Sequence, residues 1–164
     1  AVLMVTVVAG GVAAWRVFDR TPPGENPAGA ATGPSASTAA VAAGFDRCGD
    51  ALCPTGPLCW GGTLANNGKA APTWPLDCKK SHVWETFAAI PLPADAVGTR
   101  EDELKRWPSI AAVCSPSLLA SRSRKPGATK GWELDAWPMQ VGDGPRLVHC
   151  IARPEDGDSK GAAF

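Results

Sequence analysis

Six cysteines constrain the fold of this chain more than any other feature, because all of them lie beyond residue 44. They are Cys48, Cys53, Cys59, Cys78, Cys114 and Cys150. An even number of cysteines within one domain length is typical of a disulfide framework in a protein exported to an oxidising compartment. Disulfides stabilise mainly by restricting the unfolded chain, so they predict a small, loop-rich domain around a modest core.

The spacing of the cysteines narrows the many possible pairings without settling them. The first two lie in the turn-rich stretch CGDALCPTGP, where a short local loop can close. The next two flank a stretch rich in glycine, asparagine and proline that is typical of a hairpin. Cys114 falls on a predicted helix and Cys150 on the last predicted strand, so a bond between them would join helix to sheet.

A structural zinc site is the alternative interpretation of these cysteines. Cys78 and His82 are close in sequence, and His149 neighbours Cys150. However, the chain has no CxxC pair, and structural zinc sites usually present such closely spaced ligands. Adjacent residues of a strand also point to opposite faces, so His149 and Cys150 would not share an ion. We therefore expect disulfides, no metal and no cofactor.

The first 44 residues predict a membrane tether. An apolar run extends from Ala1 to Trp15, and Arg16 is the first charged residue of the chain. A tryptophan and an arginine after such a run are typical of the end of a transmembrane helix. A signal-peptide hydrophobic region is the alternative. The following residues include almost no large apolar side chain and cannot offset the entropy of ordering. We expect a transmembrane helix over 1–20, a flexible linker over 21–44 and a folded domain over 45–164. The chain would be a single-pass plasma-membrane protein with its C-terminal domain extracytoplasmic.

Composition limits the classes of partner. The chain has 16 basic and 16 acidic side chains, so no overall field favours nucleic acid, and we expect no nucleic-acid partner. Seven tryptophans, four phenylalanines and no tyrosine make tryptophan the main large aromatic residue. With 18 glycines and 16 prolines, the domain should have few long elements.

Hydrophobic periodicity predicts an α+β fold. Strands are expected over 57–60, 81–90, 132–139 and 146–152, and a helix from Thr99 that is interrupted at Pro108. In the second strand Phe87 and Ala89 should share one face. The turn at 142–145 predicts that the last two strands form an antiparallel hairpin, and the tail over 154–164 should be frayed, with a possible docking of Phe164. The expected fold is a small, mainly antiparallel sheet with one broken helix stapled to it.

Enzyme motifs are absent from the sequence. It contains no GxSxG, HExxH, P-loop or GxGxxG pattern, so we expect no catalytic residues in this segment. His82 could act as a general base, but hydrogen bonding to local backbone is the simpler interpretation. The best candidates for recognition are the basic residues Arg122, Arg124, Lys125 and Lys130. Outside a membrane, their anionic partners would be wall polymers, lipid head groups or an acidic protein surface. The alternative interpretation is that these residues form a solvated loop with no dedicated partner.

Several motifs of the chain resemble one known family. They are LCW at 58–60, DCKKSH at 77–82, VWETFAAIPLPAD at 83–95, VCS at 113–115 and GPRLVHCIA at 144–152. In this order they are similar to the septum-formation domain of actinobacterial membrane proteins. The ending GAAF and the tryptophan-rich strand resemble the versions found as ectodomains of actinobacterial serine/threonine protein kinases. Two features depart from the pattern: Pro57-Leu58 replaces the usual Gly-Asp, and CGDALC is extra.

The resemblance implies a disulfide pairing and a function. Its cysteine positions imply Cys59–Cys78 and Cys114–Cys150, which leaves Cys48 and Cys53 as an additional pair, and it marks His82 and Glu85 as candidate binding residues. It implies a non-catalytic sensor or binding domain that recognises a cell-envelope polymer or a septal protein, with a kinase domain upstream of residue 1. A structural septum-associated interaction protein is the alternative, and a secreted hydrolase or metal-binding enzyme is a third possibility.

Overall fold

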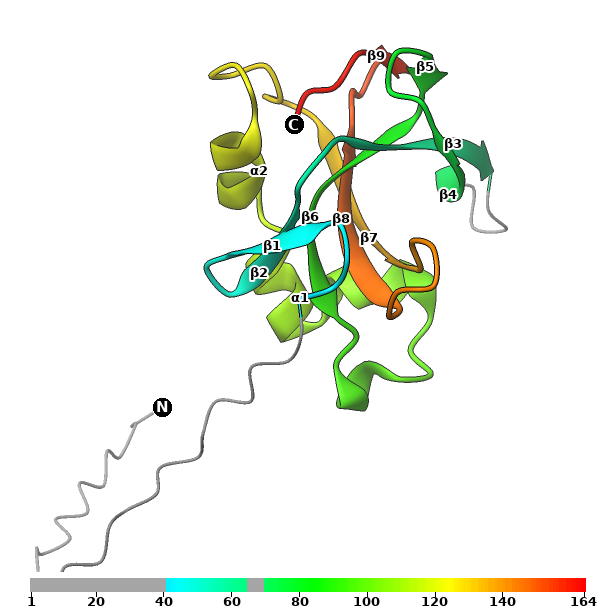
Figure 1. The fold of residues 1–164 in the computed structure, drawn as a ribbon, viewed down its shortest axis with the longest axis vertical. Helices are drawn as coiled ribbons and strands as arrows, with labels where there is room; N and C mark the ends of the chain where they lie inside the picture. The colour runs from blue at the N-terminus through cyan, green and yellow to red at the C-terminus, as the bar shows by residue number, and fades with distance from the viewer. Residues whose placement is uncertain (1–40, 65–69) are drawn as a thin grey trace, which may run out of the picture. The chain divides into compact units, whose positions relative to one another are not determined.

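Strand β6 (Trp84–Pro91) is the centre of the sheet, and the rest of the fold is arranged around it (Figure 1). The structure is a computed structural model that describes residues 41–64 and 70–164, which belong to one compact unit. The expected transmembrane helix and most of the expected linker lie outside these residues. In the described part of the chain, no helix has the length and apolar character needed to cross a membrane.

Every strand pair in the described sheet is antiparallel, as the sequence predicts. One edge of β6 pairs with β8, which pairs in turn with β7. Two strands pair with the other edge of β6: β3 near its start and β2 near its end. Strand β4 pairs with the free edge of β3, and β1 pairs with the free edge of β2. The strands are β1 (Phe45–Cys48), β2 (Ala51–Pro54), β3 (Leu58–Leu64), β4 (Ala70–Leu76), β7 (Glu133–Met139) and β8 (Leu147–Arg153).

Strand β6 is buried on both faces, which explains its nearly continuous apolar sequence. Its pairing with β8 contains an irregularity between Thr86 and Ala88. Because this bulge interrupts the alternation of the strand, Phe87 and Ala88 both pack in the core on the helical side. Ala89 instead packs with Phe45 and Leu147, so the prediction that Phe87 and Ala89 share a face was wrong.

The broken helix is confirmed, but its first part differs from the prediction. Residues Glu101–Arg106 form a 3₁₀ helix whose N-cap is Arg100, so the helix begins at Glu101 and not at Thr99. Helix α1 (Pro108–Val113) follows, and helix α2 (Pro116–Arg122) begins after Ser115, whose hydroxyl accepts a hydrogen bond from the Leu118 N–H. Prolines open both helices because their missing N–H has no intrahelical partner there. Another short 3₁₀ turn, Ala94–Ala96, precedes these elements.

Both ends of the described domain are more ordered than the sequence suggests. Ala42, placed in the expected linker, is buried beside Phe45, so the fold begins before residue 45. The expected frayed tail contains β9 (Ser159–Lys160), which pairs with β5 (Ser81–His82). Phe164 docks against Phe87 and Trp132, and this apolar contact holds the end of the segment in place.

All six cysteines form disulfides, in the pairing that the resemblance implies. The bonds are Cys48–Cys53, Cys59–Cys78 and Cys114–Cys150. The first closes the β1–β2 hairpin, the second joins β3 to the segment before β5, and the third links the end of α1 to β8. Helix and sheet are therefore joined covalently across the core.

Candidate functional site

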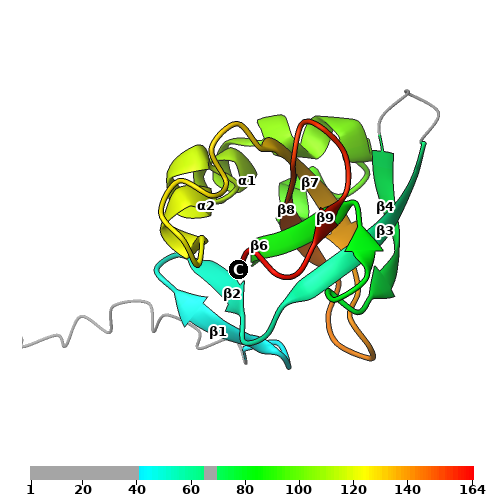
Figure 2. The same cartoon turned by 90° about the horizontal axis from the view of Figure 1, so that it is seen from above.

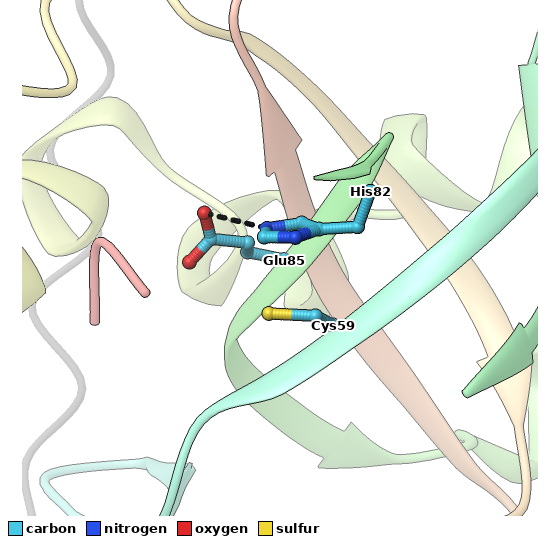
Figure 3. Close-up of side chains that lie close together, drawn as sticks. All are labelled: Cys59, His82 and Glu85. Atoms are coloured by element: carbon cyan, nitrogen blue, oxygen red, sulfur yellow. Dashed lines mark hydrogen bonds and ion pairs between the residues drawn. The ribbon is translucent and has the colours of Figure 1, made fainter. Parts of the chain in front are cut away.

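A cluster of hydrogen-bonded polar side chains lies where β5, β6 and β9 meet. His82 and Glu85 are each about 1% exposed, and Nε2 of His82 lies 3.1 Å from Oε1 of Glu85. Figure 3 shows these two side chains pointing toward one another, with the sulfur of Cys59 beside them. Ser159 of β9 completes the cluster, with its Oγ 2.8 Å from Nε2 of His82.

This cluster binds distant parts of the chain together. The Ser159 hydroxyl donates to Oε1 of Glu85 at 3.1 Å, and the Ala163 N–H donates to Oε2 at 2.7 Å. Nδ1 of His82 lies 2.8 Å from the Lys80 carbonyl oxygen, which can only accept, so Nδ1 carries a hydrogen. Every nitrogen and oxygen of the pair therefore has a partner, and we name His82, Glu85 and Ser159 the C-terminal clasp.

The clasp does not have the geometry of a catalytic triad. In a triad, the serine and the acid bind different nitrogens of the histidine. Here both contact Nε2, and the other nitrogen is occupied by a backbone carbonyl. The arrangement joins the C-terminal segment to β5 and β6 through hydrogen bonds.

The same region contains a possible set of metal ligands. One ligand atom from each of Cys59, His82 and Glu85 lies within 4.8 Å of the others. Cys59 is bonded to Cys78, however, and the thiolate, not a disulfide sulfur, is the form that binds metals. In the oxidised protein the clasp therefore supplies only the imidazole and the carboxylate, which already bind each other.

His149 occupies a separate buried position on the opposite face of β8 from Cys150. Its Nδ1 lies 3.2 Å from the hydroxyl of Thr86, which also accepts a hydrogen bond from the Trp60 indole at 2.9 Å. The rings of Phe45 and Trp60 meet the imidazole edge-on. Nε2 has no hydrogen-bond partner in the described part of the chain. Burial lowers the pKa of His149 from 6.5 to about 4, because the charged form would lose its hydration.

This shift predicts acid sensitivity. Between pH 6.5 and pH 4 the unfolded chain binds a proton at His149 that the folded protein does not. The contribution of neutral His149 to the free energy of unfolding is therefore fully present above pH 6.5 and decreases as the pH falls. The loss should reach about 3 kcal/mol near pH 4. This prediction is tested by urea unfolding of the wild type and of His149→Phe at pH 7 and pH 4.5. The carboxylates titrate in both proteins, so the difference between their losses of stability at pH 4.5 reports on His149. Parallel pH profiles for the two proteins would contradict it.

A groove of about 590 Å³ lies between the β1–β2 hairpin and helices α1 and α2. Figure 2 shows these two helices and the hairpin on the same side of β6, to its left in that view. The apolar lining of the groove comes from Ala51, Ile90, Ala112, Val113 and Leu118. The polar lining of the groove includes Asp50, Ser109, Ser115, Ser117 and Ser121. This groove could not be predicted from the sequence, because its serines come from two helices whose relative orientation is set by the turn at Cys114 and Ser115.

The structure divides the predicted basic residues into two groups. Arg122 and Arg124 line cavities beside Pro57, whereas Lys125 and Lys130 line neither cavity. Arg122 is half-buried, and the other three residues are exposed. The Arg124 N–H donates to the Ala163 carbonyl oxygen at 2.8 Å. Ala163 therefore connects the segment that contains Arg124 to the C-terminal clasp by hydrogen bonds. The sequence did not predict that these two parts of the chain are neighbours.

In the described residues these features define a class: an α+β domain held by three disulfides, with two buried polar clusters in its core, a groove on the helical side and smaller cavities beside Pro57. No protein-family model, curated protein or solved structure matches this chain. The resemblance to septum-formation domains is therefore carried forward as a proposal.

Proposed function

We propose that residues 41–164 form an extracytoplasmic ligand-binding domain without catalytic activity of its own. The observation that carries this proposal is the pairing of all six cysteines, which leaves no free thiol. Stable structural disulfides form in oxidising compartments and are rare in the cytosol. The proposed setting is the cell envelope, on a single-pass membrane anchor, as in the septum-formation domains that the sequence resembles.

The groove beside α1 and α2 is the ligand site in this proposal. Its volume of about 590 Å³ is within the range of small-molecule sites, and apolar carbons lie beside several hydroxyl groups. Serine hydroxyls can both donate and accept hydrogen bonds, so they suit a ligand that combines sugar or peptide polar groups with small apolar ones. A cell-wall fragment composed of a disaccharide and a short peptide has this chemistry.

A tryptophan in the groove should abolish this binding. Ala112→Trp fills the groove from helix α1, whereas Ala111→Trp places the same side chain at an exposed neighbouring position that does not line it. We expect Ala112→Trp to weaken binding of a soluble disaccharide-peptide fragment at least about tenfold, equivalent to about 1.4 kcal/mol, and Ala111→Trp to leave it unchanged. Calorimetric titration of the intact domain measures both affinities. Equal binding by the two variants would contradict the groove as the site.

The proposed compartment needs its own test. Mass spectrometry of the non-reduced protein from its native source should find the three disulfides and no free thiols. Six free thiols in that material would overturn the extracytoplasmic assignment, independently of what the groove binds. The kinase connection is tested by the sequence upstream of residue 1, where HRD and DFG motifs would support a receptor kinase.

A further inference from the structure

Two adjoining cavities on either side of Pro57 concentrate positive charge in a chain whose net charge is zero. The smaller, about 150 Å³, is lined by Arg122 and Arg124 together with the loop that connects β2 to β3. The larger, about 330 Å³, is lined by Arg124 and Lys79. Arg124 and Pro57 belong to both linings, so the two cavities are neighbours.

The charges in these linings are not balanced. Asp77 is the single acidic residue among the residues lining the two cavities, and its carboxylate caps the Lys79 N–H at 3.0 Å. Neither Arg122 nor Arg124 forms an ion pair within the described part of the chain. The side chains of the lining residues therefore include three basic groups and one acidic group.

One of the guanidinium groups also has an unused buried donor. Nε of Arg122 is buried and has no hydrogen-bond partner in the described residues. A buried donor without an acceptor costs free energy comparable to a lost hydrogen bond, so an acceptor in the adjoining cavity would stabilise it. Arg122 ends helix α2, and the backbone of Arg124 is held by Ala163, so both side chains start from fixed positions.

We propose that this pair of cavities is an oxyanion site that binds the phosphate or carboxylate group of a ligand. The rigid guanidinium fork matches both groups through paired N–H donors, and Arg is the residue type best suited to such recognition. The smaller cavity suits the anionic group, and the larger cavity beside Lys79 suits the rest of the ligand. This site is separate from the groove, and its existence does not depend on the function proposed above.

Neighbouring residues of the chain provide a matched test. Arg124→Gln and Lys125→Gln remove one positive charge each from adjacent positions, but only Arg124 lines the cavities. The intact domain is titrated with inorganic phosphate, glycerol phosphate and acetate at constant ionic strength, followed by the NMR signals of the two arginine side chains. We expect saturable shifts of these signals, at least a tenfold loss of affinity in Arg124→Gln and less than a twofold change in Lys125→Gln.

Each outcome decides the proposal. Tighter binding of the phosphates assigns the site to phosphorylated ligands, and tighter binding of acetate assigns it to carboxylates; both support an oxyanion site. If Arg124→Gln and Lys125→Gln weaken anion binding equally, the anions are attracted only to general surface charge, and the proposed oxyanion site is overturned. The absence of saturable shifts in the arginine NMR signals would overturn it as well. Arg122→Gln gives a second variant in case Arg124→Gln alters folding. Ala112→Trp should leave phosphate binding intact, so failure of the groove proposal remains distinguishable.

Discussion

Replacing Cys114 and Cys150 together by alanine should lower the free energy of unfolding by about 4 kcal/mol, the largest effect we expect from any one cross-link. The bond closes a loop with a sequence separation of 36 residues, against 5 for Cys48–Cys53. Restriction of the unfolded chain grows with loop length, so the Cys48–Cys53 double variant should lose only about 2 kcal/mol. Cys150 is also fully buried, and its replacement removes a sulfur from the core.

Urea unfolding under oxidising conditions measures both losses, and the Cys48–Cys53 variant is the matched control because it also removes one bond. Similar losses in the two double variants would show that loop length does not govern the effect. An unchanged melting temperature in the Cys114–Cys150 variant would refute the covalent link between helix and sheet as a source of stability.

Replacing Glu85 by alanine should lower the free energy of unfolding by about 3–5 kcal/mol, because it leaves several buried hydrogen-bonding groups without their acceptor. The loss leaves His82, the Ser159 hydroxyl and the Ala163 N–H without their shared acceptor. Glu133→Ala is the matched control. That glutamate also lies on a strand and pairs with Arg153, but its side chain is 38% exposed, so its loss should cost less than about 1 kcal/mol.

The Glu85 prediction also has a local readout. If the C-terminal clasp holds β9 against β5, hydrogen exchange at the Ala163 amide should accelerate in Glu85→Ala and stay slow in Glu133→Ala. The fluorescence of Trp132, which contacts Phe164, should change with it. Equal stability losses in the two variants, with unchanged exchange at Ala163, would show that the clasp is not a stabilising unit.

The clasp limits the role of two candidate binding residues. His82 and Glu85 are buried and hydrogen-bonded to each other, so a ligand could reach them only after the C-terminal segment moved. Arg122 and Arg124, in contrast, line cavities in the structure as it stands. Binding at the basic residues would therefore require no rearrangement, and the proposed oxyanion site is the better target for experiment.

Much of the fold could be predicted because its signals are local. The alternating pattern of the last two strands and the turn between them specified the β7–β8 hairpin, and Pro108 specified the break in the helix. The bulge at Phe87 could not be predicted, because it depends on how β6 pairs with β8. The docking of Phe164 was predicted, but the short strand that contains Ser159 was not, since Ser159 bonds to residues more than 70 positions away.

By itself, the sequence determined that this domain is a small α+β structure held by disulfides, because cysteine number, proline position and strand periodicity act over short distances along the chain. Tertiary structure alone decided which polar residues became buried partners and which line cavities. The physical reason is that burial and electrostatic surroundings depend on segments brought together in space. His82 and Glu85 thus became buried partners of each other. Arg122 and Arg124 came to line cavities, and Lys125, which belongs to the same basic run of the sequence, did not.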